Sequence, residues 1–475
     1  MKKYYSILVI LTLAFITGCK KEYAPPVITA PQTTSVEIKK TVDLSFSFNA
    51  EGGYSSATVT ATGGTAVIKT YGTEGATSGT ITVSFSAGTN VGAGAVTLTL
   101  SDSKNQSATA TAVINVEGVP TISVSKNIDA NTTWEQGKIY ILEGRITVLP
   151  GVTLTIQPGT IIKGREGSES NATALMVARG GKLMAVGTAE APIIFTSVSD
   201  NIIPGEIKSP NLDPTLNGLW GGLLILGKAP ISAESTSMQI EGIPTSDLNG
   251  LYGGTEPEDN SGVIKYVSIR HGGANIGEGN EINGLTLGGV GSGTVIENIE
   301  IVANQDDGVE WFGGTVNVKN VVVWNAGDDA IDTDQSWGGT LDNFIVINPG
   351  DECLELDGPE GIMVAKHFLK NGSIYAGNAQ GLVDLDPNSN VDIDSVYFFG
   401  LKSGQDFDEL PTDYPCTFTN FEATLPTGTV VTDFFKDGSD AFVTVVESGA
   451  NTVGADASVF QNWTWAAVSN TLSGF

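Results

Sequence analysis

Pairs of acidic residues recur at a regular spacing in the second half of the chain. Asp306-Asp307 is followed by Asp328-Asp329 after 22 residues and by Asp351-Glu352 after another 23. Carboxylate oxygens are suitable ligands for hard cations such as Ca²⁺, and two neighbouring carboxyl groups can serve as acid and base in glycoside hydrolysis. The repeated pairs therefore predict either a cation site or a polysaccharide-active site.

A short alternating segment follows each acidic pair. These segments are Val309–Phe312, Ile331–Asp334, Leu354–Asp357 and, after a longer interval, Val383–Asp386. Repeats of this length, with Ile and Val runs, Gly-rich and Asn-rich corners and almost no helical periodicity, are typical of stacked β-helix coils. We expect a parallel β-helix over residues 120–475, with Phe460–Ala467 covering its last coil.

The alternation also sorts the side chains of each coil. Those expected inside are Val309, Trp311, Ile331, Thr333, Leu354, Leu356, Val383 and Leu385. Those expected outside form two columns: Glu310, Asp332, Glu355 and Asp384 in one, and Phe312, Asp334, Asp357 and Asp386 in the other. Coils in such a stack lie about 4.8 Å apart, so each column brings like charges together and is destabilising unless it is neutralised.

Fixed positive charge is scarce in this region. Between residues 306 and 386 the only basic residues are Lys319, Lys366 and Lys370. The density of oxygen ligands suits Ca²⁺, while the alternative is that the corner acids cap backbone amides and the outward acids are solvated. The candidate metal ligands are Asp306, Asp307, Glu310, Asp328, Asp329, Asp332, Asp334, Asp351, Glu352, Glu355, Asp357, Asp384 and Asp386.

Three aromatic residues could serve as stacking platforms for sugar rings. Phe312 lies in an outward column, and Trp324 and Trp337 lie near the corners. The alternative is that all three pack beneath loops.

Several longer motifs carry a family resemblance. They are Gly218–Leu223, Glu281–Thr294, Asn304–Gly314 and Trp463–Ala466. Over residues 121–475 the chain resembles secreted or lipidated right-handed parallel β-helix proteins, which are pectin-lyase-like, of Gram-negative, bacteroidete-type bacteria. The resemblance implies a right-handed β-helix but not an activity, because this fold includes lyases, hydrolases and non-catalytic surface proteins.

One motif bears on catalysis. Gly327–Ile331 is similar to the paired-aspartate motif of polygalacturonase-type hydrolases, which implies catalytic roles for Asp328 and Asp329. The chain departs from that family's pattern, because no His-Gly dipeptide and no Arg-Ile-Lys-type clamp follows the pair. His271 precedes it, in an earlier coil, and is expected at a strand end.

The first residues resemble a bacterial lipoprotein signal. Lys2 and Lys3 precede the apolar run Ile7–Ile16, which is too short to span a membrane, and Thr17-Gly18-Cys19 follows. The resemblance implies a signal peptide over residues 1–18, a lipidated Cys19 and an outer-membrane, cell-surface location. We expect residues 19–35 to form an extended tether.

Residues 36–117 show short runs of period-two alternation separated by Gly, Asn and Ser. About seven such strands are typical of an immunoglobulin-like β-sandwich, which we interpret as a spacer. The fold class is therefore all-β, with a sandwich preceding the β-helix.

Composition excludes several functions. The formal charge is −29, so phosphate-mediated binding of nucleic acid is not expected. His271 and His367 are the only two histidines, which excludes a three-histidine metal site within one copy. Apart from Cys19 the cysteines are Cys353 and Cys416, and the sequence leaves open whether they pair.

Three functions agree with these features. The leading hypothesis is a non-enzymatic, lipid-anchored surface protein that binds a glycan, a cation or a partner protein. The second is a Ca²⁺-dependent polysaccharide hydrolase or lyase. The third is an accessory subunit that binds an outer-membrane receptor in an uptake complex.

Overall fold

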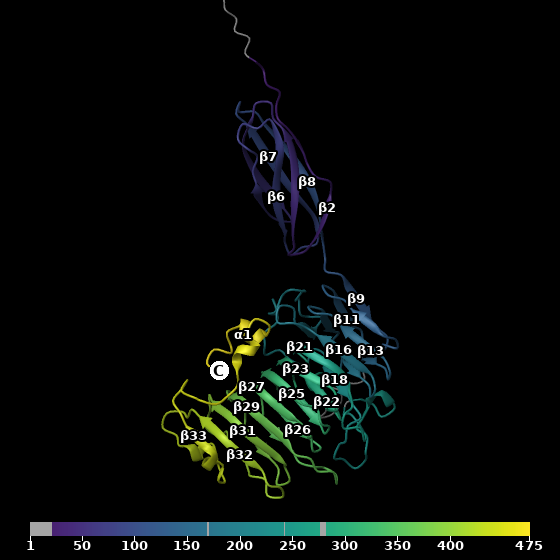
Figure 1. Ribbon diagram of the computed structural model, residues 1–475, viewed down its shortest axis with the longest axis vertical. Coiled ribbons are helices and arrows are strands. Elements are labelled where there is room, and N and C mark those ends of the chain that lie inside the picture. Colours follow the sequence, from purple (N-terminus) through teal and green to yellow (C-terminus); the bar gives the residue numbers. More distant parts are fainter. Residues whose placement is uncertain (1–20, 169–170, 242, 276–281) are drawn as a thin grey trace, which may run out of the picture. The chain divides into compact units, whose positions relative to one another are not determined.

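The computed structural model describes residues 21–168, 171–241, 243–275 and 282–475. The chain divides into two compact units, Met1–Val119 and Pro120–Phe475 (Figure 1). Cys19, together with the rest of the predicted signal, lies outside the described residues. Within them, no helix combines the length and the apolar character needed to cross a membrane.

The first unit is a β-sandwich of two four-stranded sheets. Alternate residues of its strands, among them Phe46, Phe85 and Leu98, are buried between the sheets. One sheet has the order β1 (Val27–Thr29), β3 (Thr41–Asn49), β6 (Ser78–Ala87), β5 (Gly64–Thr70). The other has the order β2 (Thr34–Glu37), β8 (Ser107–Glu117), β7 (Gly92–Asp102), β4 (Tyr54–Thr62). The sandwich predicted from the alternating runs is confirmed.

The predicted tether is wrong from Val27 onward. Strand β1 pairs with β3, and β2 pairs with β8, so residues 27–37 belong to the sandwich. The two strands are short and lie beside Pro25, Pro26 and Pro31, which made the segment resemble a linker. Edge strands tolerate nearby prolines because they have only one hydrogen-bonded neighbour.

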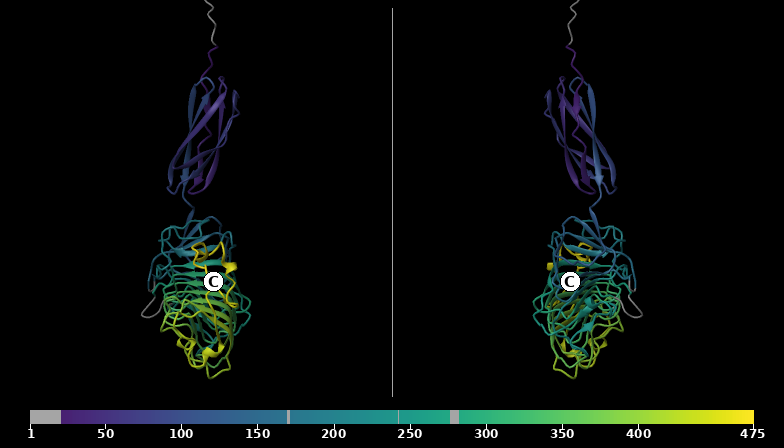
Figure 2. Two further views of the ribbon diagram at one scale, coloured as in Figure 1. Left: turned by 90° about the vertical axis from the view of Figure 1, so that its left-hand side faces the viewer. Right: turned by 90° about the vertical axis from the view of Figure 1, so that its right-hand side faces the viewer.

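The second unit is a parallel β-helix, as predicted, and its strands pair in parallel from coil to coil (Figures 1 and 2). The strands of its long sheet are β33 (Val443–Val445), β32 (Thr417–Ala423), β31 (Val391–Phe399), β29 (His367–Tyr375), β27 (Thr340–Ile347), β25 (Val318–Trp324), β23 (Val295–Val302), β21 (Gly262–Arg270), β17 (Ile193–Ser197), β14 (Ile161–Gly164), β11 (Ile139–Leu142) and β9 (Thr121–Val124), with β10 (Thr132–Trp134), β13 (Thr153–Ile156) and β16 (Lys182–Val186) beside them.

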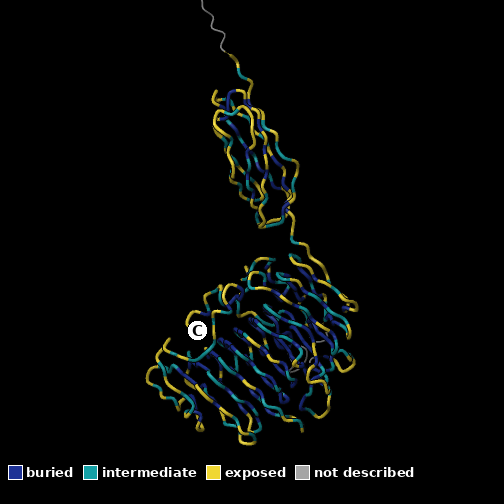
Figure 3. Tube along the Cα trace, viewed as in Figure 1, coloured by how far each residue is buried: buried dark blue, intermediate teal, exposed yellow. Residues whose placement is uncertain are grey.

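The second sheet of the β-helix carries the acidic repeats. Its strands are, in order, β12 (Ile146–Val148), β15 (Leu175–Val177), β18 (Leu223–Leu226), β22 (Leu285–Gly288), β24 (Val309–Phe312), β26 (Ile331–Asp334), β28 (Leu354–Leu356) and β30 (Asp384–Leu385). The inward side chains of both sheets form one continuous apolar core. In Figure 3 much of the trace along the β-helix strands is accordingly dark blue, the colour of buried residues.

A column of left-handed residues bends the long sheet. Asn298, Asn320, Asn343 and Asn371 occupy equivalent positions and have φ between 58° and 67°. Asparagine tolerates this conformation better than most residues, and here Asn320 and Asn343 also each donate to the preceding asparagine side chain at 2.8 Å. The bend resets the alternation, so the core receives both the residue two positions before and the residue directly after the asparagine, as with Val318 and Val321 around Asn320.

The C-terminal segment, residues 454–475, does not cover the last coil as predicted. Its elements η5 (Ala457–Phe460) and α1 (Trp465–Val468) pack on the outer face of the long sheet, where Trp463 and Trp465 bury Val322 and Ile345 (Figure 1). The residues after β32 cover the last coil instead, through η3 (Val431–Asp433), η4 (Ser439–Phe442) and the apolar side chains around them. Apolar side chains on the outer face of a middle strand must be covered, just as the open end of the β-helix must be covered.

Candidate functional site

Strand pairing aligns the acidic repeats in the register that the alternation predicts. Glu310 pairs with Asp332, Asp332 with Glu355, and Glu355 with Asp384 on consecutive strands. Phe312 pairs with Asp334 in the neighbouring column. The residues predicted to point inward are all buried: Val309, Trp311, Ile331, Thr333, Leu354, Leu356, Val383 and Leu385.

The outward acids are nevertheless not all solvated. Asp307, Glu310, Asp329 and Asp332 are buried, and Asp306, Asp334, Asp351, Glu352, Glu355, Asp357 and Asp384 are half-buried. Asp386, at the end of the second column, is exposed. The interpretation of the outward acids as a simply solvated column is therefore wrong for the first coils.

A long insertion buries part of this face. Residues 227–261, between β18 and β21, contain the short hairpin β19 (Met238–Gln239) and β20 (Leu251–Tyr252) and the turn η2 (Leu248–Gly250). Ile231 and Tyr252 of the insertion pack on outward residues of the second sheet, including Phe312. Tyr252 donates to Gln335 at 3.0 Å, and the Ser232 amide donates to the Gln335 carbonyl at 2.9 Å.

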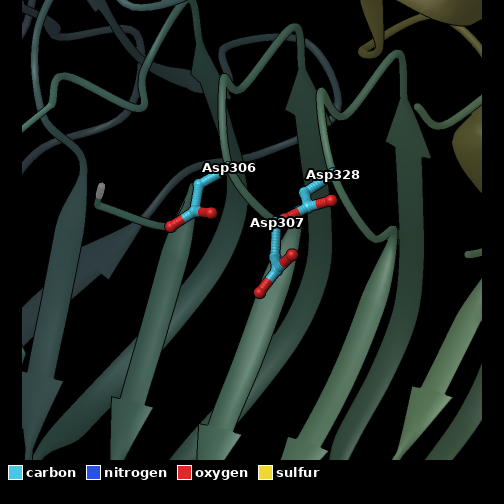
Figure 4. Close-up of side chains that lie close together, drawn as sticks. All are labelled: Asp306, Asp307 and Asp328. Carbon is cyan, nitrogen blue, oxygen red and sulfur yellow. The ribbon is translucent and has the colours of Figure 1, made fainter. Parts of the chain in front are cut away.

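Two overlapping groups of carboxylates form where the insertion meets the acidic rows. Asp307, Glu310 and Asp332, which we call the buried triad, each offer an oxygen within 4.8 Å of the others. Asp306, Asp307 and Asp328 form the second group with the same spacing. Figure 4 shows that Asp307 points along the strands while Asp306 and Asp328 stand on successive corners above it. Asp307 belongs to both groups.

Asn283 adds a neutral oxygen at the buried triad. Its side-chain nitrogen donates to Glu310 Oε2, and Asn283 is 1% exposed. Its Oδ1 atom is buried and accepts no hydrogen bond from the described residues. A buried amide oxygen without a donor is costly in free energy unless something else binds it.

Some of the corner acids cap backbone amides, as the alternative interpretation predicted. Asp307 Oδ1 accepts from the Asp329 amide at 3.0 Å, and Asp329 Oδ1 accepts from the Glu352 amide at 2.5 Å. In each case the backbone hydrogen bond uses one oxygen of the carboxyl group.

Burial and like charges raise the pKa values of these acids. Burial, followed by repulsion from neighbouring carboxylates, raises the pKa values of Asp307, Glu310 and Asp332 well above their usual range. The Glu310 and Asp332 carboxyl groups are hydrogen-bonded to each other, as are those of Asp329 and Glu355. Each pair can therefore share a proton when no cation is bound.

The three lysines of this region do not compensate the buried triad. Lys319 and Lys370 pair with Asp342 at 3.9 and 3.6 Å, and Lys366 pairs with Asp392 at 2.8 Å. All of these partners lie on strands of the long sheet. Among the ion pairs found in the described ranges, none includes a member of the buried triad.

On the outer face of the long sheet, unlike on the second sheet, acidic side chains are paired with basic ones. Acidic and basic residues alternate from strand to strand in one register, which forms a paired ladder that sequence reasoning missed. Its members are Lys265, Glu297, Lys319, Asp342, Lys370 and Asp394. Pockets of about 420, 420 and 240 Å³ lie along it. Part of the signal was present in the sequence, since Glu297, Lys319 and Asp342 recur at the same intervals of 22 and 23 residues as the acidic pairs.

The three aromatic candidates do not form sugar platforms. Phe312 packs under Tyr252 of the insertion, and Trp324 packs against Trp465 of the C-terminal segment. Trp337 lies in the core and stacks on Trp311 at 4.7 Å. Each prediction was wrong because a distant segment, or the coil interior, covers the ring.

The residues considered for catalysis have distinct surroundings. Asp328 belongs to the corner group, whereas Asp329 is buried and its pKa is raised to about 10 by burial and by Glu355. His271 follows the end of β21, as expected for a strand-end residue, and contacts the Leu216 carbonyl at 2.5 Å. Cys353 and Cys416 are free thiols.

The stacked coils with one acid-lined sheet define a pectate-lyase-like parallel β-helix protein. The chain belongs to the family described as the pectate-lyase like beta helix domain, whose model matches residues 126–464. No curated protein matches the chain.

Two solved structures are similar to parts of the chain. The family 28 exopolygalacturonase of Yersinia enterocolitica has 11% identity over 90% of this chain and 88% of its own, with a TM-score of 0.20. The SrpA adhesin of Streptococcus sanguinis has 15% identity over 23% of this chain and 69% of its own, with a TM-score of 0.19. Superpositions this poor carry no argument about function.

Proposed function

We propose that the chain is a non-enzymatic binding protein whose β-helix holds a divalent cation, Ca²⁺, in the buried triad. The observation that carries this proposal is a set of three buried carboxylates, Asp307, Glu310 and Asp332, with oxygens within 4.8 Å of one another. Buried charges normally occur with a partner of opposite charge or as metal ligands.

The geometry suits calcium. Calcium–oxygen distances are about 2.3 to 2.6 Å, so two ligand oxygens on opposite sides of one ion lie about 4.8 Å apart. The spacing within the buried triad meets this limit. Asn283 lies beside Glu310, and rotation of its amide would offer Oδ1, which lacks a donor among the described residues, as a fourth oxygen of the type that Ca²⁺ accepts.

The paired ladder supports the same proposal, because its acids have lysine partners and the stacked acids of the second sheet do not. On the long sheet each acidic member faces a lysine of the neighbouring strand, as Glu297 faces Lys265 at 2.8 Å. The second sheet stacks its acids in the same kind of register without such lysines. This fold can therefore neutralise a column of acids internally, and where it does not, a cation from solution is the simplest counter-charge.

The proposal includes the location. The lipoprotein-like motif that ends at Cys19 supports attachment to the outer membrane, with the β-helix as the binding domain at the cell surface. The proposed further ligand is a glycan, a partner protein or an outer-membrane receptor. The paired ladder offers a polar surface with pockets along it for this ligand.

Replacing Asp332 with Asn tests the cation site. Asp332→Asn replaces a buried carboxyl group, whose ionisation is opposed by burial and neighbouring carboxylates, with an amide that does not ionise. In EDTA at alkaline pH the variant should therefore unfold at a higher temperature than the wild type. It should also bind Ca²⁺ at least about tenfold more weakly, since one of the ligand charges is lost. Thermal unfolding of the full chain across a CaCl₂ titration measures both effects.

Asp386→Asn is the matched control, because Asp386 is exposed at the far end of the neighbouring column. It should behave like the wild type in EDTA and in CaCl₂. A wild-type chain whose unfolding does not respond to Ca²⁺ would overturn the proposed function.

A polysaccharide hydrolase is the second candidate, and one observation favours it. Asp329 is held protonated beside Glu355, and a protonated carboxyl group next to a carboxylate is the arrangement that general acid catalysis requires. If this candidate holds, release of reducing ends from an anionic polysaccharide should fall at least about a hundredfold in Asp329→Asn and stay unchanged in Asp386→Asn. Equal turnover in the wild type and Asp329→Asn would remove this candidate.

A further inference from the structure

A groove runs along the paired ladder on the outer face of the long sheet. Its first two pockets, each of about 420 Å³, adjoin one another, because Lys319 and Asp342 line both of them. The third pocket, of about 240 Å³, is lined by Lys370 and Asp394, which are the next members of the ladder. Neighbouring strands lie about 4.8 Å apart, so the three pockets follow one another along a single row of side chains.

The two sides of the groove are formed by other segments. On one side the C-terminal segment contributes Gly454, Asp456 and Val459 to the second pocket. The Asp456 amide donates to Asn343 Oδ1 at 2.6 Å, which attaches this segment to the long sheet. The other side, in the first pocket, consists of hydroxyl and amide side chains: Ser292, Thr294, Asn317 and Thr340. The groove is therefore formed before a ligand arrives, which lowers the entropic cost of binding.

The floor of the groove has no net charge. Three lysines alternate with three acids along the ladder, from Lys265 to Asp394. A polyanion would be repelled by the acids and a polycation by the lysines, so neither matches the floor. A neutral chain whose groups both donate and accept hydrogen bonds matches it at every strand.

The centre of the ladder has room for hydroxyl groups between its charges. Lys319 Nζ lies 3.9 Å and Lys370 Nζ 3.6 Å from Asp342 Oδ2. Both separations are too long for a direct hydrogen bond. A hydroxyl group beside either pair can accept from the ammonium group and donate to the carboxylate. The carboxylate is held in position, because Asp342 Oδ1 accepts from Asn371 Nδ2 at 2.7 Å.

An exposed aromatic ring lies in the same groove. Phe368 stands beside the ladder, in register with Thr340 and Asp392 on the neighbouring strands, and is 44% exposed. In the third pocket it is surrounded by polar side chains: Lys370, Asp392, Asp394, Thr417 and Thr419. A sugar ring has apolar faces and a polar edge, so it can stack on the phenyl ring while its hydroxyl groups bond to the surrounding side chains.

We propose that this groove binds an uncharged polysaccharide chain, with Phe368 as a stacking platform and the paired ladder as the source of hydrogen bonds. The inference rests on the part of the proposed function that assigns a further ligand to the paired ladder, and not on the cation. A protein partner suits the groove less well, because the cores of protein–protein interfaces are depleted of Lys, Glu and Asp, which form the floor here. The groove and the buried triad lie on different sheets, so the two sites can be tested separately.

The experiment is affinity electrophoresis of the full chain through native gels that each contain one polysaccharide. The neutral probes are β-glucan, glucomannan and dextran, and the anionic probe is polygalacturonate. The variants are Phe368→Ala and Lys319→Gln. Their matched controls, Tyr71→Ala and Lys208→Gln, change an exposed aromatic residue of the sandwich and an exposed lysine that lines none of the three pockets. Each gel is run in EDTA and in CaCl₂, and circular dichroism checks that each variant is folded.

We expect at least one neutral polysaccharide to retard the wild type, equally in EDTA and in CaCl₂, and polygalacturonate to have no effect. Phe368→Ala should weaken the binding at least about tenfold and Lys319→Gln at least about threefold, whereas both controls should bind like the wild type. Retardation by polygalacturonate alone, unchanged binding in either variant, or no retardation by any probe would overturn the assignment of the groove. None of these results bears on the buried triad, which is tested by the CaCl₂ titration of Asp332→Asn.

Discussion

In EDTA, the full chain should become less stable as the pH rises from 7 to 9.5, and the stabilisation that saturating CaCl₂ provides should grow over the same range. Burial and neighbouring carboxylates raise the pKa of Glu352 to about 8 and that of Asp329 to about 10, and they raise the pKa values of Asp334 and Asp357 to about 7. In the unfolded chain such groups titrate near pH 4.

The direction of the change in stability follows from the number of protons bound in the folded and in the unfolded state. Between pH 7 and 9.5 the folded state keeps protons on Asp329 and partly on Glu352, whereas the unfolded state has lost them. The free energy of unfolding therefore falls as the pH rises, by about 1.4 kcal/mol per pH unit for each proton held by the folded state alone. The buried histidines do not interfere, because their pKa values are lowered and their contribution is complete below this range.

Calcium should oppose the trend, because it binds the ionised carboxylates of the buried triad and displaces their protons. The stabilisation by CaCl₂ should therefore grow with pH, reaching about 2.7 kcal/mol at a free concentration one hundred times the Kd. Urea unfolding at pH 7, 8 and 9.5, in EDTA and in CaCl₂, measures both trends. A flat profile in EDTA would show that the acids are ionised in the fold, and Asp329→Asn should flatten the wild-type slope.

Replacing Arg270 with Met should destabilise the β-helix by about 3–5 kcal/mol, because it leaves Glu300 buried without its cationic partner. Both side chains are 0% exposed, and Arg270 Nη2 lies 3.3 Å from Glu300 Oε2. Ser268 donates to the same Glu300 oxygen at 2.5 Å, and Arg270 also stacks on Trp465. Methionine keeps much of the side-chain volume, so the loss of charge dominates.

The paired ladder supplies the control on the same two strands. Lys265→Met breaks the pair with Glu297, whose members are 32% and 38% exposed, and it should cost less than about 1 kcal/mol. Urea unfolding followed by tryptophan fluorescence measures both variants. All seven tryptophans lie between residues 134 and 465, so the signal reports the β-helix alone. Similar losses in the two variants would contradict the predicted difference.

The effect of Arg270→Met should extend to the C-terminal segment. Glu300 Oε1 accepts from the Ala466 amide at 2.9 Å, so this carboxylate links the long sheet to α1. Without Arg270, the Glu300 carboxylate loses a contact that holds it in position, so its hydrogen bond with the Ala466 amide should weaken. Hydrogen exchange at residues 464–468 should therefore accelerate in Arg270→Met and not in Lys265→Met.

The repeated acids and the alternation around them were sufficient to predict the β-helix and the register of its second sheet. The fold makes this possible because every coil pairs with the next at a fixed interval, so equivalent sequence positions must stack. Glu310, Asp332 and Glu355 were placed in one column on that basis alone. The paired ladder could have been found in the same way, by following Lys319, Asp342 and Lys370 along the repeat.

What the sequence could not decide is which outward positions are exposed. Alternation assigns a side chain to a face of the sheet, but it carries no information about segments far along the chain that cover that face. The insertion buries Glu310, Asp332 and Phe312, and the C-terminal segment buries Trp324.

The candidate site shows the difference between what the sequence determined and what only the tertiary structure decided. The sequence by itself determined that acids stack on one sheet, because the stacking follows from local periodicity. Only the tertiary structure decided that Asp307, Glu310 and Asp332 are enclosed and that Asn283 contacts Glu310. The reason is physical: the pKa values and ligand properties of a carboxylate depend on its solvation, and solvation depends on long-range packing.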